Sequence, residues 1–249
     1  MRESFYEEYF RIEDRHWWFV GRRRIVLTVL DDSLDSGGAA QRRILDLGCG
    51  TGTMLSYLRQ FGDAEGVDAD ERAVAFCRAR GEDRVRRLES ERLPFADASV
   101  DLITALDVLE HIEDDRATLR EIRRVLRPGG TLLATVPAYR WMWGAQDEIS
   151  HHFRRYDIAD LRRKIPEAGL DLRRITHFNS ILFLPIALIR LARRLRPARG
   201  ELRSDFELTQ EGATNRLLGR AFSSEARWLR RRSLPFGVSI LILAGRPET

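Results

Sequence analysis

Cysteine and lysine are almost absent from this chain of 249 residues. Its two cysteines, Cys49 and Cys77, cannot form the disulfide framework of a small secreted domain, so we expect a reducing compartment. Lys164 is the single lysine among 42 basic residues, and the positive charge therefore comes from arginine. We interpret this as a coding bias, because the arginines are scattered among acidic residues as on solvated helix faces.

Long apolar runs are missing as well, since no stretch reaches the ~18 apolar residues of a membrane-spanning helix. Residues 1–10 are acidic and aromatic, unlike a secretory signal peptide, and we expect a cytoplasmic protein. The net charge of +4 is modest and no stripe of basic and aromatic side chains accompanies it, which disfavours a nucleic-acid partner.

The chain is organised around residues 44–52, which read ILDLGCGTG. An apolar run typical of a buried parallel strand leads into Gly48, Gly50 and Gly52, and residues 54–61 have helical spacing. A strand, a glycine turn and a helix present backbone N–H groups to a ligand, although a tight turn alone has the same pattern. The spacing is G-x-G-x-G and differs from the G-x-G-x-x-G of dinucleotide sites.

A second strand is predicted to end at Asp68, within the segment EGVDAD of residues 65–70. Asp68 lies roughly 20 residues beyond the glycine loop, where a carboxylate can accept hydrogen bonds from both hydroxyls of a ribose. The two features together predict a nucleoside-containing cofactor.

Five short motifs follow one another in the order found in one protein family. They are D-L-G-C-G-T-G (46–52), G-V-D (66–68), L-P-F (93–95), V-L-E-H (108–111) and L-R-P-G-G (126–130). Each is weak alone, but the series, which covers about residues 43–137, resembles the class I S-adenosylmethionine-dependent methyltransferases, in particular a type 11-like bacterial subgroup.

The resemblance implies an α/β fold, a doubly wound Rossmann-like sheet of seven strands with the last strand antiparallel. We expect a single domain with four parts, which are an N-terminal helical cap (1–41), a cofactor-binding core (42–178), a helical insert (179–235) and a last strand with the tail (236–249). We expect one helix over 114–126 that stops at Pro128, with Glu110 and His111 at the start of that helical region.

The same resemblance implies S-adenosyl-L-methionine as the cofactor. Its expected contacts are Asp46, Gly48, Gly50, Gly52, Asp68, Glu89, Ser90, Leu106 and Asp107. Glu89 stands where relatives commonly have an aspartate that accepts from the adenine amino group. Leu106 and Asp107 would lie against the methionine part.

The N-terminal segment contains E-x-x-H-W-W-F-x-x-R-R, which resembles the opening of the same subgroup. By that resemblance the segment would roof the pocket, with Trp17, Trp18 and Arg22 near the methyl acceptor. A helix pair packed on the sheet accounts for most of these aromatic side chains equally well, but three consecutive aromatics cannot all face one core.

The loop 137–156 carries the densest group of candidate acceptor-site residues. Its pattern W-x-x-x-D-x-x-x-x-H-x-R-R-Y again resembles the subgroup and singles out His152. We expect His152 as the general base, with His111 as the second candidate, because histidine titrates near neutrality. Tyr156 and Arg155 would orient the base or the substrate, and Tyr139 would also contact the substrate.

We expect no metal, because no cysteine or carboxylate spacing accompanies the adjacent histidines 151 and 152.

Residues 180–195 form an apolar stretch that ends in arginines. We expect a helix docked beside the acceptor pocket. The alternative is an interfacial helix that makes weak peripheral contact with a membrane or a lipid-linked acceptor.

These features predict methyl transfer to a small-molecule or a lipid- or glycan-linked acceptor, at oxygen or nitrogen. A nicotinamide-dependent oxidoreductase is the first alternative, disfavoured by the glycine spacing. A non-catalytic S-adenosylmethionine-binding module is the second, because a cofactor motif does not guarantee turnover. The residues do not indicate an oligomeric state.

Overall fold

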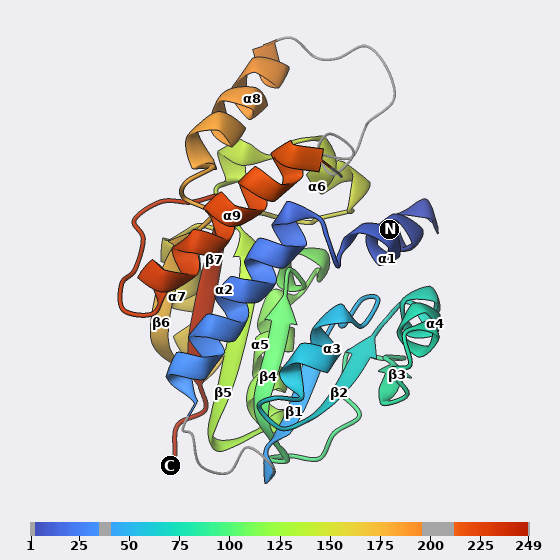
Figure 1. Cartoon of the computed structure of the whole chain (residues 1–249). Helices are drawn as coiled ribbons and strands as arrows, with labels where there is room; N and C mark the ends of the chain where they lie inside the picture. Colours follow the sequence, from blue (N-terminus) through green and yellow to red (C-terminus); the bar gives the residue numbers. More distant parts are fainter. Residues whose placement is uncertain (1–2, 35–40, 196–211, 249) are drawn as a thin grey trace.

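The computed structural model describes residues 3–34, 41–195 and 212–248. Its centre is a seven-stranded sheet in the order β3-β2-β1-β4-β5-β7-β6 (Figure 1). The strands are β1 (Arg43–Leu47), β2 (Asp63–Asp68), β3 (Val85–Arg87), β4 (Val100–Leu106), β5 (Leu126–Pro137), β6 (Asp171–Phe178) and β7 (Ser239–Gly245). Strand β7 is antiparallel to both of its neighbours, β5 and β6, while β1 to β5 pair in parallel. The predicted sheet is confirmed.

Helices cover both faces of the sheet. They are α1 (Glu3–Ile12), α2 (Trp17–Ser33), α3 (Thr53–Leu58), α4 (Glu71–Ala79), η2 (Leu109–His111), α5 (Asp115–Val125), η3 (Arg140–Met142), α6 (Ala145–Ile149), α7 (Ile158–Glu167), α8 (Phe183–Leu195) and α9 (Gly212–Leu229). One core contains buried side chains of α2, α3, α4 and α9, and the other contains those of α5 and α7. The consecutive residues Ile44 and Leu45 belong to different cores because strand side chains alternate between faces.

The chain becomes extended before the Pro-Gly-Gly motif, one residue earlier than the predicted end of the helix at residue 126. Helix α5 ends at Val125, and β5 begins at Leu126 and runs through the motif. The register of β4 and β5 shifts between Val100 and Leu102, so residues 127–130 bulge from the ladder. The bulge accommodates Pro128, which has no N–H to donate. Glu110 and His111 do not begin α5 but lie in the short turn η2, and Asp114 caps α5 by accepting from the backbone N–H of Ala117.

The N-terminal segment is a pair of helices, and the second helix packs on the sheet beside α9 (Figure 1). Helix α8 follows β6 and extends away from the sheet. Along the chain, α8 and α9 come after β6 and before β7, where the sequence predicted a helical insert. Residues 196–211 of this insert lie outside the described residues.

Gly21 allows α2 and α9 to pack closely. A Cβ atom at this position would lie 2.2 Å from Cδ1 of Phe222, which is fully buried. We predict that Gly21→Ala lowers the free energy of unfolding by about 1–3 kcal/mol, the usual cost of overpacking.

Gly219 in α9 is the matched control, because a Cβ there would meet only Trp17 at an ordinary 3.6 Å. Gly219→Ala should instead stabilise the fold by roughly 0.5–1 kcal/mol through helix propensity. Urea denaturation of both variants measures the difference. Equal changes in stability for the two variants would contradict the close packing of α2 against α9 at Gly21.

Candidate functional site

A cavity of about 1030 Å³ lies at the carboxyl ends of β1, β2 and β4. Its walls also include α1, α2, the loop after β5 and the start of α8. Most of the predicted site residues line it, namely Trp17, Trp18, Arg22, Asp46, Gly48, Gly50, Asp68, Glu89, Ser90, Leu106, Asp107, His111, His152 and Arg155. Its volume is at the upper end of the range for ligand sites, which leaves room for two reactants.

The three loop glycines have left-handed backbones, with φ values of 67° at Gly48, 56° at Gly50 and 86° at Gly52. A Cβ on Gly50 would meet no atom within 4 Å, so this residue borders open space in the cavity. A Cβ on Gly48 would lie 2.6 Å from Val108, and one on Gly52 would lie 3.0 Å from the Cys77 sulfur. Gly50 therefore leaves room for a ligand, whereas the other two allow close packing inside the protein.

Asp68 lies at the end of β2 and connects that strand to the glycine loop. Its carboxylate accepts hydrogen bonds from the backbone N–H of Gly50 at 2.9 Å and of Asp70 at 3.0 Å. Burial raises its pKa. A carboxylate has about four acceptor positions, so Asp68 can still accept from two ligand hydroxyls.

Two more carboxylates line the cavity from β1 and from the end of β4. Asp46 accepts from the Thr104 hydroxyl at 2.6 Å, and burial raises its pKa to about 7. Asp107 accepts from the Thr135 hydroxyl at 2.9 Å and from the guanidinium of Arg22. Arg22, predicted to contact the acceptor, therefore forms an ion pair in the cavity wall.

The N-terminal helices are attached to the glycine loop by Glu13. This buried carboxylate accepts from the Thr51 hydroxyl and pairs with Arg80 at 2.7 Å. Tyr6, Tyr9 and Trp17 from the same helices line the cavity. The segment thus covers the cavity as the sequence predicted.

The part of the cavity formed by the loop after β5 is built around the buried carboxylate of Asp147. It accepts from the backbone N–H of Gly144 at 2.8 Å and from the Arg155 guanidinium at 2.7 Å, and it lies 2.9 Å from Nδ1 of His152. Burial alone would raise the pKa of Asp147, but the hydrogen bond with His152 and the charge of Arg155 lower it to about 2. The ionised carboxylate fixes the orientation of the His152 ring.

His111 lies next to His152, with ring centroids 4.5 Å apart and an interplanar angle of 85°. Burial, and secondly His152, lower the pKa of His111 to about 4, so its ring is neutral at pH 7. The preceding residue, Glu110, is fully buried and lines the same cavity. Burial raises the pKa of Glu110 well above its usual range.

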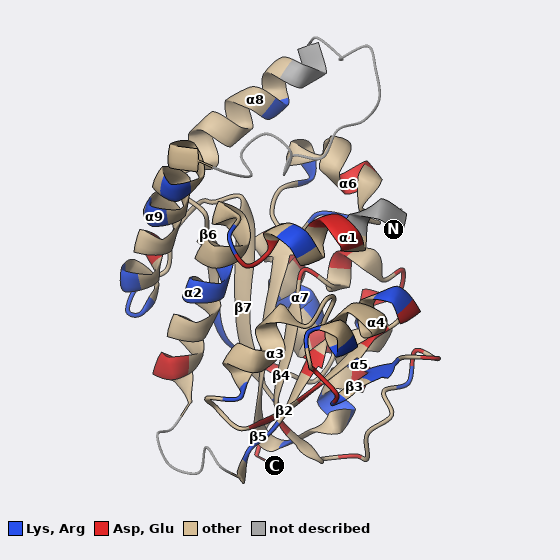
Figure 2. Cartoon of the chain, turned by 45° about the vertical axis from the view of Figure 1, so that its right-hand side comes forward, with Lys and Arg blue, Asp and Glu red and all other residues tan. Residues whose placement is uncertain are grey.

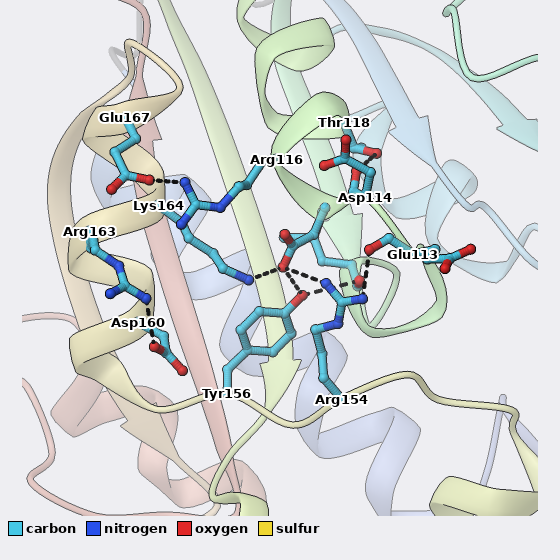
Figure 3. A network of polar contacts seen from close by, with 12 residues as sticks. Glu113, Asp114, Arg116, Thr118, Arg154, Tyr156, Asp160, Arg163, Lys164 and Glu167 are labelled. Carbon is cyan, nitrogen blue, oxygen red and sulfur yellow. Dashed lines mark hydrogen bonds and ion pairs between the residues drawn. The ribbon is translucent and has the colours of Figure 1, made fainter.

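Tyr156 does not line the cavity. Its hydroxyl donates to the Asp115 carboxylate at 2.8 Å and lies 3.1 Å from the Leu109 carbonyl oxygen. Figure 3 shows Tyr156, Arg154 and Lys164 pointing toward one shared carboxylate, that of Asp115. Tyr156 therefore holds the loop beside Leu109 and fits a positioning role better than the predicted catalytic one.

Two other predicted residues also lie outside the cavity wall. Tyr139 stacks on His177 with ring centroids 5.2 Å apart, away from the position expected for a substrate contact. Gly52, the last glycine of the loop, occupies the N-cap position of α3. Conversely, Glu110 and Asp147 belong to the site without being among the predicted site residues, although each is the acidic residue of a motif that contains a predicted histidine.

Comparison with known proteins identifies the domain. Residues 45–134 match the model of a methyltransferase domain family. A Mycolicibacterium smegmatis protein, named a probable S-adenosylmethionine-dependent methyltransferase, is 30% identical over 165 residues, which are 65% of this chain and 62% of that protein. The chain carries a methyltransferase domain.

One further relative and one solved structure of the same fold are also similar to this chain. The ubiquinone biosynthesis O-methyltransferase of Acinetobacter baylyi is 25% identical over 169 residues, 59% of this chain and 71% of that enzyme. The same fold is found in a chain of the complex between a Haloferax volcanii methyltransferase and the Trm112 methyltransferase activator, with a TM-score of 0.60. The two sequences are 23% identical, and the match covers 99% of this chain and 94% of that chain. This chain spans less than two thirds of the M. smegmatis relative.

The M. smegmatis relative is named as S-adenosylmethionine-dependent, and the residues of this methyltransferase domain fit that cofactor. Gly50 leaves space that a side chain would fill, and the carboxylate of Asp68 retains free acceptor positions beside that space. The predicted family and cofactor are thereby supported over the nicotinamide alternative.

We predict that Gly50→Leu lowers the affinity for S-adenosylmethionine at least tenfold, or about 1.4 kcal/mol, because the new side chain enters the cavity. Calorimetric titration of the folded variant measures this change.

Gly81→Leu is the matched control, since Gly81 also has a left-handed backbone, with φ 82°, and a Cβ at this position would likewise meet no atom within 4 Å. Both variants incur a similar backbone cost of ~1–2 kcal/mol. Unchanged affinity in Gly50→Leu, or an equal loss in Gly81→Leu, would contradict the assignment.

Proposed function

We propose that this chain transfers the methyl group of S-adenosylmethionine to an oxygen or nitrogen nucleophile of a small, largely apolar acceptor. The observation that carries the proposal is that Gly50 and Asp68 line the same cavity as the oriented His152. The cofactor's sulfonium supplies an electrophilic methyl group, so the protein has to align the two reactants and exclude water.

In this proposal the cofactor lies across the ends of β1, β2 and β4. Asp68 accepts from the ribose, Glu89 and Ser90 border the adenine, and Leu106 and Asp107 border the methionine part. All five residues line the cavity. Trp17 and Trp18 of the N-terminal segment line the cavity and would exclude water from it.

His152 is the residue that we propose to activate the acceptor. Asp147 holds Nδ1 of the ring, which leaves Nε2 as the atom that can act on a hydroxyl. Arg155 is buried and donates to Asp147 and to the carbonyl of Ala138, and it therefore maintains this arrangement. The ubiquinone biosynthesis relative, named as an O-methyltransferase, supports an oxygen nucleophile.

An apolar acceptor also suits helix α8. Leu182, Ile186 and Ile189 line the cavity, while Leu184 and Leu188 are 64% and 57% exposed. Figure 2 shows that the described part of α8 projects from the domain and carries little charge. Among the described residues, no helix combines the length and apolarity needed to cross a membrane. We propose that α8 makes weak peripheral contact with lipid while its other side borders the acceptor.

The proposed activity is tested by incubating the protein with methyl-labelled S-adenosylmethionine and fractionated extract. A labelled small molecule identifies the acceptor. Cofactor binding without any labelled product would favour the non-catalytic module instead.

We predict that His152→Ala lowers turnover of that acceptor by roughly 10²–10⁴-fold, the range for a positioned group that handles a proton. Affinity for S-adenosylmethionine should remain nearly unchanged. Steady-state kinetics and calorimetry measure the two effects.

His151→Asn is the control for this change, because asparagine tolerates the left-handed backbone of His151, at φ 55°. It should retain turnover. Full turnover in His152→Ala would remove His152 from the mechanism, and a matching fall in melting temperature would indicate a structural role.

For α8, we predict that Leu184→Ser combined with Leu188→Ser reduces co-sedimentation with anionic lipid vesicles at least tenfold. Full burial of one leucine side chain in lipid would contribute roughly 1.5–3 kcal/mol to membrane binding, so the loss of two leucines should weaken binding clearly. Leu217→Ser on α9, where the leucine is 67% exposed, is the control and should bind as the wild type does. Equal binding by all three proteins would refute the lipid contact.

A further inference from the structure

Three potential metal ligands converge in the wall of the cavity. Glu110 and His111 come from the turn η2, and His152 comes from the loop after β5. One ligand atom from each residue lies within 4.8 Å of the other two, and all three residues line the cavity.

Glu110 has no hydrogen-bonding partner for its side chain. Both carboxylate oxygens are buried, and neither has a partner among the described parts of the chain. A buried carboxylate without a partner is costly to the fold unless a cation or a proton satisfies it. A bound cation would account for an acidic residue at this place.

The two histidines are held as metal-ligating histidines usually are. Asp147 lies 2.9 Å from Nδ1 of His152, and the backbone of Ser150 forms a hydrogen bond with the ring of His111. A ligating histidine almost always donates its other ring N–H to a carboxylate or a backbone carbonyl, which fixes the ring and its tautomer. In both rings one nitrogen then remains available in the cavity.

We propose that Glu110, His111 and His152 bind a divalent cation of the zinc type and leave a coordination position open toward the acceptor. Two imidazole nitrogens, one carboxylate oxygen and an open position are the donor set of catalytic zinc sites. The sequence predicts no metal site, because its adjacent histidines 151 and 152 have no cysteine or carboxylate at ligand spacing. The fold instead joins His152 to two residues distant in sequence.

This inference rests on the proposed methyl transfer and specifies how His152 activates the acceptor. A coordinated hydroxyl has a lowered pKa and loses its proton to water. The oxygen then forms a bond to the methyl carbon as the carbon–sulfur bond breaks, and the electron pair remains on sulfur as S-adenosylhomocysteine.

The test uses the full chain after treatment with a chelator, with Co²⁺ as the spectroscopic probe. We expect one equivalent of Co²⁺ to bind and to produce visible absorption that Zn²⁺ abolishes. Glu110→Gln, His111→Ala and His152→Ala should each weaken binding at least 10-fold, because even the loss of a ligand's hydrogen-bonding partner costs about 10–100-fold. His151→Asn is the matched control and should bind Co²⁺ as the wild type does.

Glu110→Gln also separates cation binding from folding. The Glu110 side chain has no hydrogen bond to the described residues that the change could remove, so the melting temperature of the cation-free variant should equal or exceed that of the wild type. Zn²⁺ should raise the melting temperature of the wild type and leave that of Glu110→Gln unchanged.

The inference is overturned if Co²⁺ does not saturate a single site, or if the three variants bind it as tightly as the wild type does. Methyl transfer that persists in a chelator would also overturn it while leaving the proposed function intact. Saturable Co²⁺ binding that the three variants lose, in a protein that fails to bind S-adenosylmethionine, would support the cation site and contradict the proposed function.

Discussion

The hydrogen bond from the Gly50 N–H to the Asp68 carboxylate is the contact on which the cofactor side of the site depends. It joins the turn after β1 to the end of β2, which are neighbouring parallel strands. Because Gly50 has a left-handed backbone, its N–H points to Asp68 and its Cα faces open space. One contact thus sets both the shape of the loop and the position of the carboxylate beside it.

Asp147 has the corresponding role in the part of the cavity that contains His152. Its buried carboxylate pairs with Arg155, lies 2.9 Å from Nδ1 of His152, and is 3.6 Å from a guanidinium nitrogen of Arg190 in α8. A buried carboxylate is stable only when its charge is compensated, so these residues have to converge on it. The loop after β5 and the helical insert are therefore fixed to each other at the point where the acceptor would lie.

The sheet, the glycine loop and Asp68 could be predicted from the sequence because each belongs to a short continuous pattern. Predictions failed where contacts between distant residues decide the outcome. The bulge at residues 127–130 depends on register against β4, and the hydroxyl of Tyr156 is occupied by Asp115 and Leu109. The clustering of Glu110 with His152 depends on how the loop after β5 folds back, and no local pattern contains that information.

If the cofactor and the acceptor meet between Asp68 and His152, as we propose, a crystal structure with S-adenosylhomocysteine bound will show it. We expect ribose hydroxyls within hydrogen-bonding distance of the Asp68 carboxylate, and a sulfur atom that faces Glu110, His111 and His152. A nucleoside bound with its ribose away from Asp68, or a sulfur that faces away from these three residues, would contradict it.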